Sequence, residues 1–284
     1  MGHGGRHRKD DIYTERATTA MAMMASSMTF ATCAAAAQRI GLVLGIGCGT
    51  PLVGGLASAV AVGASAALSG QSARLISHKH ERQLSKRARG KAPELFKDVD
   101  VIRDIFIGGS VFLFLSRGNL SRIFPSDVAR VGANAYKSVA AKGSEYATDG
   151  QRRLLSTWLK AHGCHHCGSK RGSVIGDHMP PNKKAFGSGA AAKANRRASL
   201  PRRIVNYIRG VPLQRFYPQC EPCSALQSVA VRTGMRKFVT HRVGFKYGIV
   251  TGAACGVAAL HYDEIRNWID ENVALARKLF TSSR

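Results

Sequence analysis

Three short stretches decide the fold of this chain: CHHC at residues 164–167, VIGDHM at 174–179 and CEPC at 220–223. Gly168 follows the first CxxC pair and Pro218 precedes the second, so each pair lies in a turn. Such a turn brings two sulfurs to one ion, and two turns supply the four ligands of a structural zinc site. We therefore expect a closed Zn²⁺ site made of Cys164, Cys167, Cys220 and Cys223.

The two pairs are separated by 52 residues, which is longer than in a simple zinc ribbon and indicates an insert with its own function. Two unrelated redox pairs are the alternative interpretation. His165 and His166 lie inside the first pair. Either histidine can replace a cysteine as a ligand, although we expect them beside the metal ligands or on the surface.

The insert holds one acidic residue in a basic segment. Between Cys164 and Gln219 there are 11 Lys or Arg residues, and the only acid is Asp177, directly before His178. A carboxylate can hold a divalent cation at a phosphodiester, and a histidine can take a proton from the attacking water. Lysine and arginine would contact the nucleic-acid backbone.

Two CxxC pairs around Gly-Asp-His resemble the HNH or His-Me finger (ββα-metal) endonucleases of the zinc-stapled type, over about 70 of the 284 residues. The resemblance implies a hairpin whose first strand ends at the Asp-His pair. It implies that Asp177 binds a catalytic Mg²⁺ or Mn²⁺ and that His178 is the general base. It also implies an asparagine that orients the histidine, with Asn195 at the usual spacing and Asn182 as the earlier alternative.

One position departs from the family pattern. Members commonly carry His or Asn directly after the last cysteine as a second metal ligand, whereas this chain has Ser224. Gln227, one turn further along, is a weaker candidate ligand through its amide oxygen. The alternative function is therefore a catalytically inactive zinc module with a structural, nucleic-acid-docking or assembly-docking role, in which Asp177 and His178 only stabilise a turn.

The predicted fold class is α+β, with a small zinc-bound ββα module flanked by mainly helical segments rich in glycine and alanine. Apolar spacing predicts a helix that Gly163 ends, and another helix that begins at the second CxxC pair. The predicted organisation has five parts: 1–38, disordered or targeting; 39–73, a glycine-rich apolar helical segment; 74–150, a basic linker and helical region; 151–240, the zinc-bound module; and 241–284, an apolar run and an amphipathic helix.

Residues 40–73 carry no formal charge, and this run exceeds the roughly 20 residues that span a bilayer. Its richness in small residues suits close helix packing in lipid, with a buried glycine-rich hairpin as the alternative. Seven Lys or Arg residues follow within 74–91. We expect membrane contact through residues 41–70, and a toxin-like effector that delivers a nuclease is a further interpretation. The apolar run within 93–116 is too short to span, and we expect it in a core.

The chain has a formal net charge of +25, from 42 Lys and Arg against 17 Asp and Glu. Such an excess favours DNA or RNA as a partner, then anionic lipid or an acidic protein assembly. An odd number of cysteines that includes two CxxC pairs is not typical of a secreted disulfide framework. We therefore expect a reducing compartment, with membrane-associated and organellar locations both open.

Overall fold

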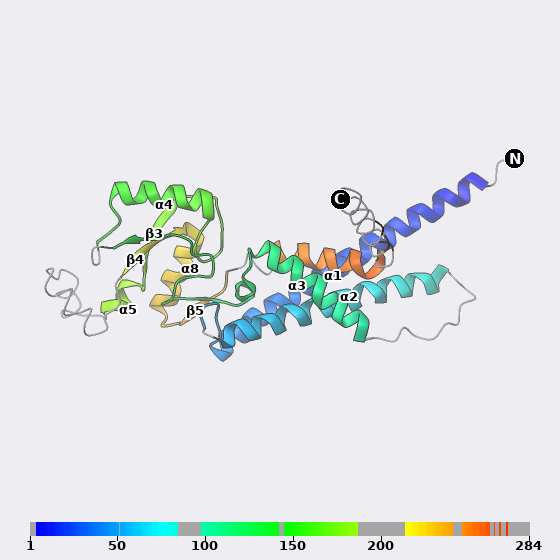
Figure 1. Ribbon diagram of the computed structural model, residues 1–284, viewed down its shortest axis with the longest axis horizontal. Helices are drawn as coiled ribbons and strands as arrows, with labels where there is room; N and C mark the ends of the chain where they lie inside the picture. Colours follow the sequence, from blue (N-terminus) through cyan, green and yellow to red (C-terminus); the bar gives the residue numbers. More distant parts are fainter. Residues whose placement is uncertain are drawn as a thin grey trace, which may run out of the picture. The chain divides into compact units, whose positions relative to one another are not determined.

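The computed structural model describes residues 4–50, 52–84, 98–141, 145–186, 214–240 and 246–261, together with residues 264, 267 and 271. The chain divides into two compact units. Unit 1 comprises Met1–Ala36, Ala59–Leu120 and Gly244–Arg284, and unit 2 comprises Ala37–Ser58 and Ser121–Val243. Helices are combined with small antiparallel sheets, which is compatible with the α+β class (Figure 1).

Unit 1 is helical. Its described helices are α1 (Gly4–Leu44), α2 (Val53–Leu84), α3 (Asp98–Leu115) and the short apolar helix Gly248–His261, and the first two continue into unit 2. Phe30 of α1 stacks on Phe112 of α3 with ring centroids 6.0 Å apart, and Tyr247 meets Phe112 edge-on at 6.3 Å. These aromatic contacts join α1, α3 and the segment that leads into the last described helix.

α1 departs from one of two sequence expectations. The polar start of the chain predicts disorder or a targeting segment over residues 1–38, and the single helix over residues 4–44 differs from disorder only. Alanine and methionine dominate residues 20–37, and both residues have high helix propensity, so this apolar part supports a helix that continues toward the N-terminus. The 93–116 region likewise contains α3, whose buried residues include Asp104, Gly108 and Phe112.

Unit 2 contains the strands. In chain order its elements are the 3-10 helix η1 (Leu120–Ile123), β1 (Ser126–Asp127), β2 (Val139–Ala140), α4 (Asp149–His162), β3 (Val174–Met179), α5 (Asn182–Phe186), β4 (Arg215–Cys220), α8 (Glu221–Arg232) and β5 (Lys237–Phe238). One sheet has the order β2-β4-β3, all antiparallel, and β1 pairs with β5 in a second sheet. β3 is therefore an edge strand.

The helix predicted before Gly163 is α4. Thr148 caps it in a capping box with Gln151, and Gly163 ends it with φ 93°, a backbone conformation that favours glycine. Leu155 of α4 packs with Phe216 of β4, and a Cβ added to Gly176 of β3 would lie 3.1 Å from Leu155. α4 therefore covers the sheet face that carries Gly176 and Phe216.

The helix predicted after the second CxxC pair is α8, which covers the opposite face of the sheet. Asp177 pairs in register with Tyr217, and His178 pairs with Phe216. Because side chains alternate along a strand, Asp177 and His178 point to opposite faces. Asp177 faces Gln227 of α8, whereas His178 lies on the α4 face, with its ring centroid 4.4 Å from that of Phe216.

Some sequence predictions fall outside the described residues. Asn195, the predicted partner of the catalytic histidine, lies in the segment 187–213 between α5 and β4. Six of the 11 basic residues counted between the cysteine pairs lie there as well. The amphipathic helix predicted after residue 262 is also outside, apart from three single positions.

Candidate metal centre and catalytic pocket

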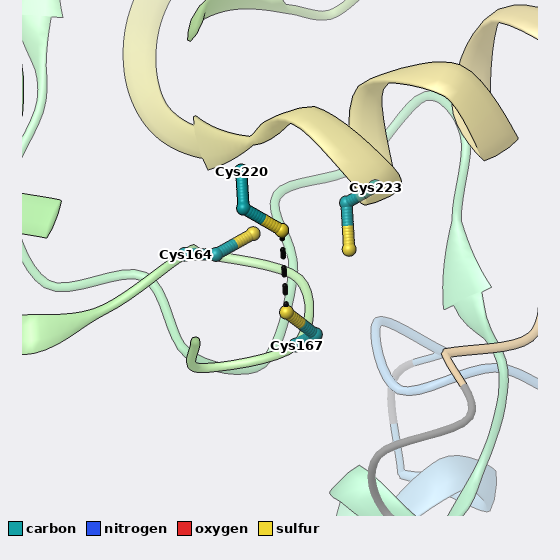
Figure 2. A group of neighbouring side chains, drawn as sticks. All are labelled: Cys164, Cys167, Cys220 and Cys223. Carbon is teal, nitrogen blue, oxygen red and sulfur yellow. Dashed lines mark hydrogen bonds between the residues drawn. The ribbon is translucent and has the colours of Figure 1, made fainter. Parts of the chain in front are cut away.

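The four cysteines of the two CxxC pairs meet in unit 2. Cys164 and Cys167 lie in the turn after α4, Cys220 is the last residue of β4, and Cys223 lies in the first turn of α8. All four are buried, and their sulfurs lie within 4.8 Å of one another. Figure 2 shows the four side chains pointing toward one centre, with the sulfurs of Cys167 and Cys220 3.5 Å apart.

This cluster can hold a metal ion such as zinc. Hydrogen bonds from the three neighbouring thiols hold the pKa of Cys167 well below its usual range, so at least one thiol readily becomes the thiolate that binds metal. The first pair is fixed through its backbone: the Cys164 N–H donates to the Ser169 carbonyl, and the Gly168 N–H donates to the Cys164 carbonyl. The turn predicted for residues 164–168 is therefore present in the structure, and this turn is the first knuckle.

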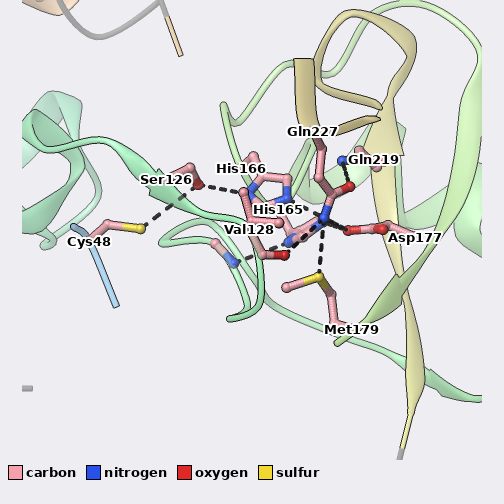
Figure 3. A network of polar contacts seen from close by, with 10 residues as sticks. Cys48, Ser126, Val128, His165, His166, Asp177, Met179, Gln219 and Gln227 are labelled. Atoms are coloured by element: carbon pink, nitrogen blue, oxygen red, sulfur yellow. Dashed lines mark hydrogen bonds and ion pairs between the residues drawn. The ribbon is translucent and has the colours of Figure 1, made fainter. Parts of the chain in front are cut away.

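A second cluster lies within the same unit and was not predicted as a group. His165, His166 and Asp177 are buried, with their nearest ligand atoms within 4.8 Å of one another. Nε2 of His165 lies 3.0 Å from Oδ2 of Asp177, and Nε2 of His166 lies 3.6 Å from it (Figure 3). Both histidines of the CHHC motif therefore face the carboxylate that the sequence singled out.

The backbone sets the tautomer of His165. The N–H of Gly132 donates to Nδ1 of His165 at 3.1 Å, and a backbone N–H can only donate. The proton of the neutral ring is therefore on Nε2, which donates to Asp177. A side chain at position 132 would not fit this contact, because a Cβ there would lie 2.3 Å from the His165 carbonyl oxygen.

His166 is held differently. Its Nδ1 lies 2.6 Å from the hydroxyl of Ser126 in β1, and its Nε2 has no hydrogen-bond partner among the described residues. The ring also meets Phe238 edge-on at 4.8 Å and lies 3.8 Å from the ring of His165. Residues from β1, β5 and the first CxxC turn thus converge on the His166 ring.

Gln227 presents nitrogen, not oxygen, to Asp177. Its Nε2 lies 3.2 Å from Oδ2 of Asp177 and 3.3 Å from the carbonyl of Val128, and its Oε1 accepts from Gln219 at 2.8 Å. The contacts with two acceptors on one side and a donor on the other fix the orientation of the amide. In this arrangement Gln227 orients the carboxylate, whereas the sequence suggested a metal ligand through the amide oxygen.

The buried carboxylate is ionised. Burial raises the pKa of Asp177, but the hydrogen bond from His165 and the nearby His166 ring outweigh this effect and lower the pKa to about 2. Burial and the neighbouring His165 ring lower the pKa of His166 to about 4, so that ring is neutral at pH 7. Directed hydrogen bonds from His165 and Gln227 therefore stabilise the anion.

His178 is more accessible than Asp177. Its Nε2 lies 3.0 Å from the main-chain carbonyl oxygen of Glu145. Because a carbonyl only accepts, Nε2 carries the proton of the neutral ring and Nδ1 carries the lone pair. The contact with Phe216 and this hydrogen bond hold the imidazole in one orientation.

Asp177 and His178 both line one open pocket of about 360 Å³ along the edge strand β3. The remaining lining comes from β3, β4, α5 and α8 and their ends: Ile175, Gly176, Pro181, Asn182, Lys183, Gln219, Ser224, Gln227, Ser228, Val231 and Arg232. The pocket therefore combines a carboxylate, an imidazole and two cationic side chains. It also contains Ser224, the position after the last cysteine, at its α8 wall.

The sequence identified the four cysteines, Asp177 and His178, and the structure brings them into one unit. The sequence did not predict the contacts of Asp177 with His165 and His166. The two adjacent histidines inside the first CxxC pair were the signal that could have indicated them. Asn182 accepts a hydrogen bond from Gln214 at 2.8 Å. Comparisons with family models, with curated proteins and with solved structures found no match.

Proposed function

We propose that the protein is a metal-dependent endonuclease whose catalytic pocket lies along the edge strand β3, next to a structural zinc ion. The observation that carries this proposal is the shared pocket of Asp177 and His178, which Lys183 and Arg232 also line. A nucleic-acid phosphate bound along the open edge of β3 would lie near Asp177 on one face of the strand, His178 on the other, and two positive charges. These are the components that hydrolysis of a phosphodiester needs.

Zinc is the metal that best fits the four buried sulfurs. A site of four cysteines with no oxygen donor selects zinc over magnesium or calcium. Its role would be structural, because four protein ligands leave no open position for water or substrate. The ion would join the knuckle after α4 to the start of α8 and so fix both walls of the network around Asp177.

His178 is the proposed general base. Its Nε2 proton faces the Glu145 carbonyl, and this contact sets the tautomer of the neutral ring. The Phe216 ring and the Glu145 carbonyl hold the imidazole before substrate arrives, which reduces the reorganisation needed in the reaction. The imidazole would accept a proton from the attacking water, and Lys183 and Arg232 would bind the phosphate oxygens.

Asp177 is the proposed ligand of the catalytic metal. The hydrogen bonds that described residues make to this carboxylate fall on Oδ2, so Oδ1 is the oxygen left for a cation in the pocket. One carboxylate together with the Ser224 hydroxyl suits a weakly held Mg²⁺ or Mn²⁺. Such a cation, when bound, would polarise the phosphate and stabilise the leaving oxygen.

The test uses the full-length chain with Mg²⁺ or Mn²⁺ on supercoiled plasmid, branched DNA, single-stranded DNA and RNA. We expect cleavage of at least one substrate. His178→Ala should lower its rate by roughly 10²-fold or more, the usual contribution of a general base. His162→Ala is the matched control, because His162 lies outside the pocket and stacks on Tyr136. The zinc content of both variants should equal that of the native chain.

A second candidate function is a zinc-stabilised docking module without catalysis. It is favoured by the burial of Asp177 and by its contacts with His165 and Gln227, which are also typical of a structural network. In that case no substrate is cleaved with any divalent metal, and His178→Ala leaves nucleic-acid affinity unchanged. Asp177→Asn would then lower the melting temperature without changing a measurable activity.

A further inference from the structure

The interior of unit 1 is built from small residues in close contact. A Cβ on Gly252 would lie 2.5 Å from the Ser26 carbonyl oxygen. A Cβ on Gly108 would lie 2.4 Å from the Cβ atom of Ala66. The helix Gly248–His261 therefore packs directly on the backbone of α1, and α3 packs closely on α2. Helices approach in this way in lipid, where tight van der Waals packing replaces the hydrophobic effect between helices.

Polar groups also join these helices from inside. The Ser26 hydroxyl donates to the Ser69 carbonyl at 2.6 Å, and the Ser69 hydroxyl donates back to the Ser26 carbonyl at 3.1 Å. Arg74 of α2 forms an ion pair with the buried carboxylate of Asp104 in α3. Hydrogen bonds and neutralised charges in a helix interior are the polar contacts expected within a bilayer.

The outer surface of the same helices is apolar. On α1, Met21, Met24 and Met28 are exposed at helical spacing, and Met28 is 68% exposed. On α3, Val99, Ile102 and Phe106 form a second exposed stripe, with Phe106 74% exposed. A helix of a water-soluble protein turns such a stripe inward. In unit 1 these stripes point outward, while the described interior consists mainly of small and polar side chains around the buried Phe30 and Phe112.

Length and charge indicate which partner covers this surface. Two candidate membrane spans, Thr14–Leu44 and Val53–Lys79, have 31 and 27 residues. At 1.5 Å per residue they are about 46 and 40 Å long, and the hydrocarbon core is about 30 Å thick. Each contains more than 20 consecutive uncharged residues, and the second leads into the basic segment 74–91. Lysine and arginine at the end of a span suit anionic headgroups.

We propose that unit 1 is embedded in a lipid bilayer, with α1 and α2 crossing its hydrocarbon core. α3 and the helix Gly248–His261 complete a bundle in which the Arg74–Asp104 pair is shielded from lipid. This inference does not depend on the nuclease proposal, because it uses no residue of the catalytic pocket or of the cysteine cluster. It extends the sequence prediction for residues 41–70 to four helices, one of which, α3, was expected to lie in a core.

The test is cell-free synthesis of the full-length chain with liposomes of phosphatidylcholine and phosphatidylglycerol, followed by an alkaline carbonate wash and flotation. We expect the chain to float with the liposomes after the wash. Release by carbonate would mean peripheral attachment through the basic segment and would overturn the proposal. A chain that is monodisperse in water without liposomes would also overturn it, because the apolar surface would then be covered by protein.

A pair of variants tests lipid contact directly. Met28→Lys places a charge near the middle of α1 on the exposed stripe, and we expect a several-fold smaller floating fraction. Met235→Lys is the matched control, because Met235 is 50% exposed in unit 2 and should tolerate lysine without loss. Equal flotation of the two variants would show that Met28 does not face lipid, even if the chain still binds membranes.

Discussion

At the residue scale, neighbouring positions in the candidate site differ in how well the sequence predicts them. The cysteines and the Asp177-His178 pair follow from spacing, because a CxxC turn and a strand end have fixed local geometry. The contact of Asp177 with His165 could not be predicted, because it depends on where β3 runs relative to the first knuckle. The role of Gly132 is also not local, since its N–H meets His165 from a distant loop.

Ser224 gives the sharpest prediction at this scale. It lines the pocket at the start of α8, where the proposed nuclease would need a second ligand for its metal. Ser224→Asn would add an amide oxygen there, and we expect the apparent affinity for Mn²⁺ in the cleavage assay to rise about tenfold. Ser228→Asn, which also lines the pocket one turn later, is the control. Equal effects of the two substitutions would contradict a specific ligand position at 224.

At the element scale, α4 and α8 were predictable because their boundaries depend on local signals, namely a glycine stop and a start at the second CxxC pair. The pairing of β2 with β4 was not predictable, because Val139 and Phe216 are far apart in sequence. The packing of α3 was predictable only in part, since Phe112 is buried as expected of a core element. Its length suggested a core element, but hydropathy alone does not reveal that Phe106 and Phe114 face outward.

Two adjacent glycines of α3 allow the helix packing to be tested. A Cβ on Gly108 would collide with Ala66 and approach the Cys255 sulfur at 2.8 Å, whereas a Cβ on Gly109 would meet nothing within 4 Å. We expect Gly109→Ala to stabilise the helix by roughly 0.5–1 kcal/mol. Gly108→Ala should instead destabilise unit 1 by about 1–3 kcal/mol through overpacking. Denaturation of the detergent-solubilised chain, followed by circular dichroism, measures both, and effects of the same sign would refute the packing.

At the scale of the whole molecule, the metal should stabilise one unit and not the other. All four cysteines of the cluster belong to unit 2, and they join the turn after α4 to the start of α8 across 52 residues. The contacts described for unit 1, such as Ser26 with Ser69, involve no cysteine ligand. The sequence predicted the zinc module, but the division of α1 and α2 between two units depends on contacts that a sequence pattern does not specify.

Metal removal is therefore expected to unfold unit 2 and to leave unit 1 folded. Binding of structural zinc is worth about 10–16 kcal/mol, which is comparable with the roughly 5–15 kcal/mol that stabilises a folded domain. After chelation, the amides of β3, β4 and α8 should lose their protection from hydrogen exchange, whereas those of α3 should keep theirs. Cys220→Ser should reproduce this pattern without a chelator, and Cys255→Ser, a buried cysteine of unit 1, should not. Loss of protection in both units at once would mean that unit 1 depends on the folded metal module, and unchanged protection in α8 would exclude a structural metal.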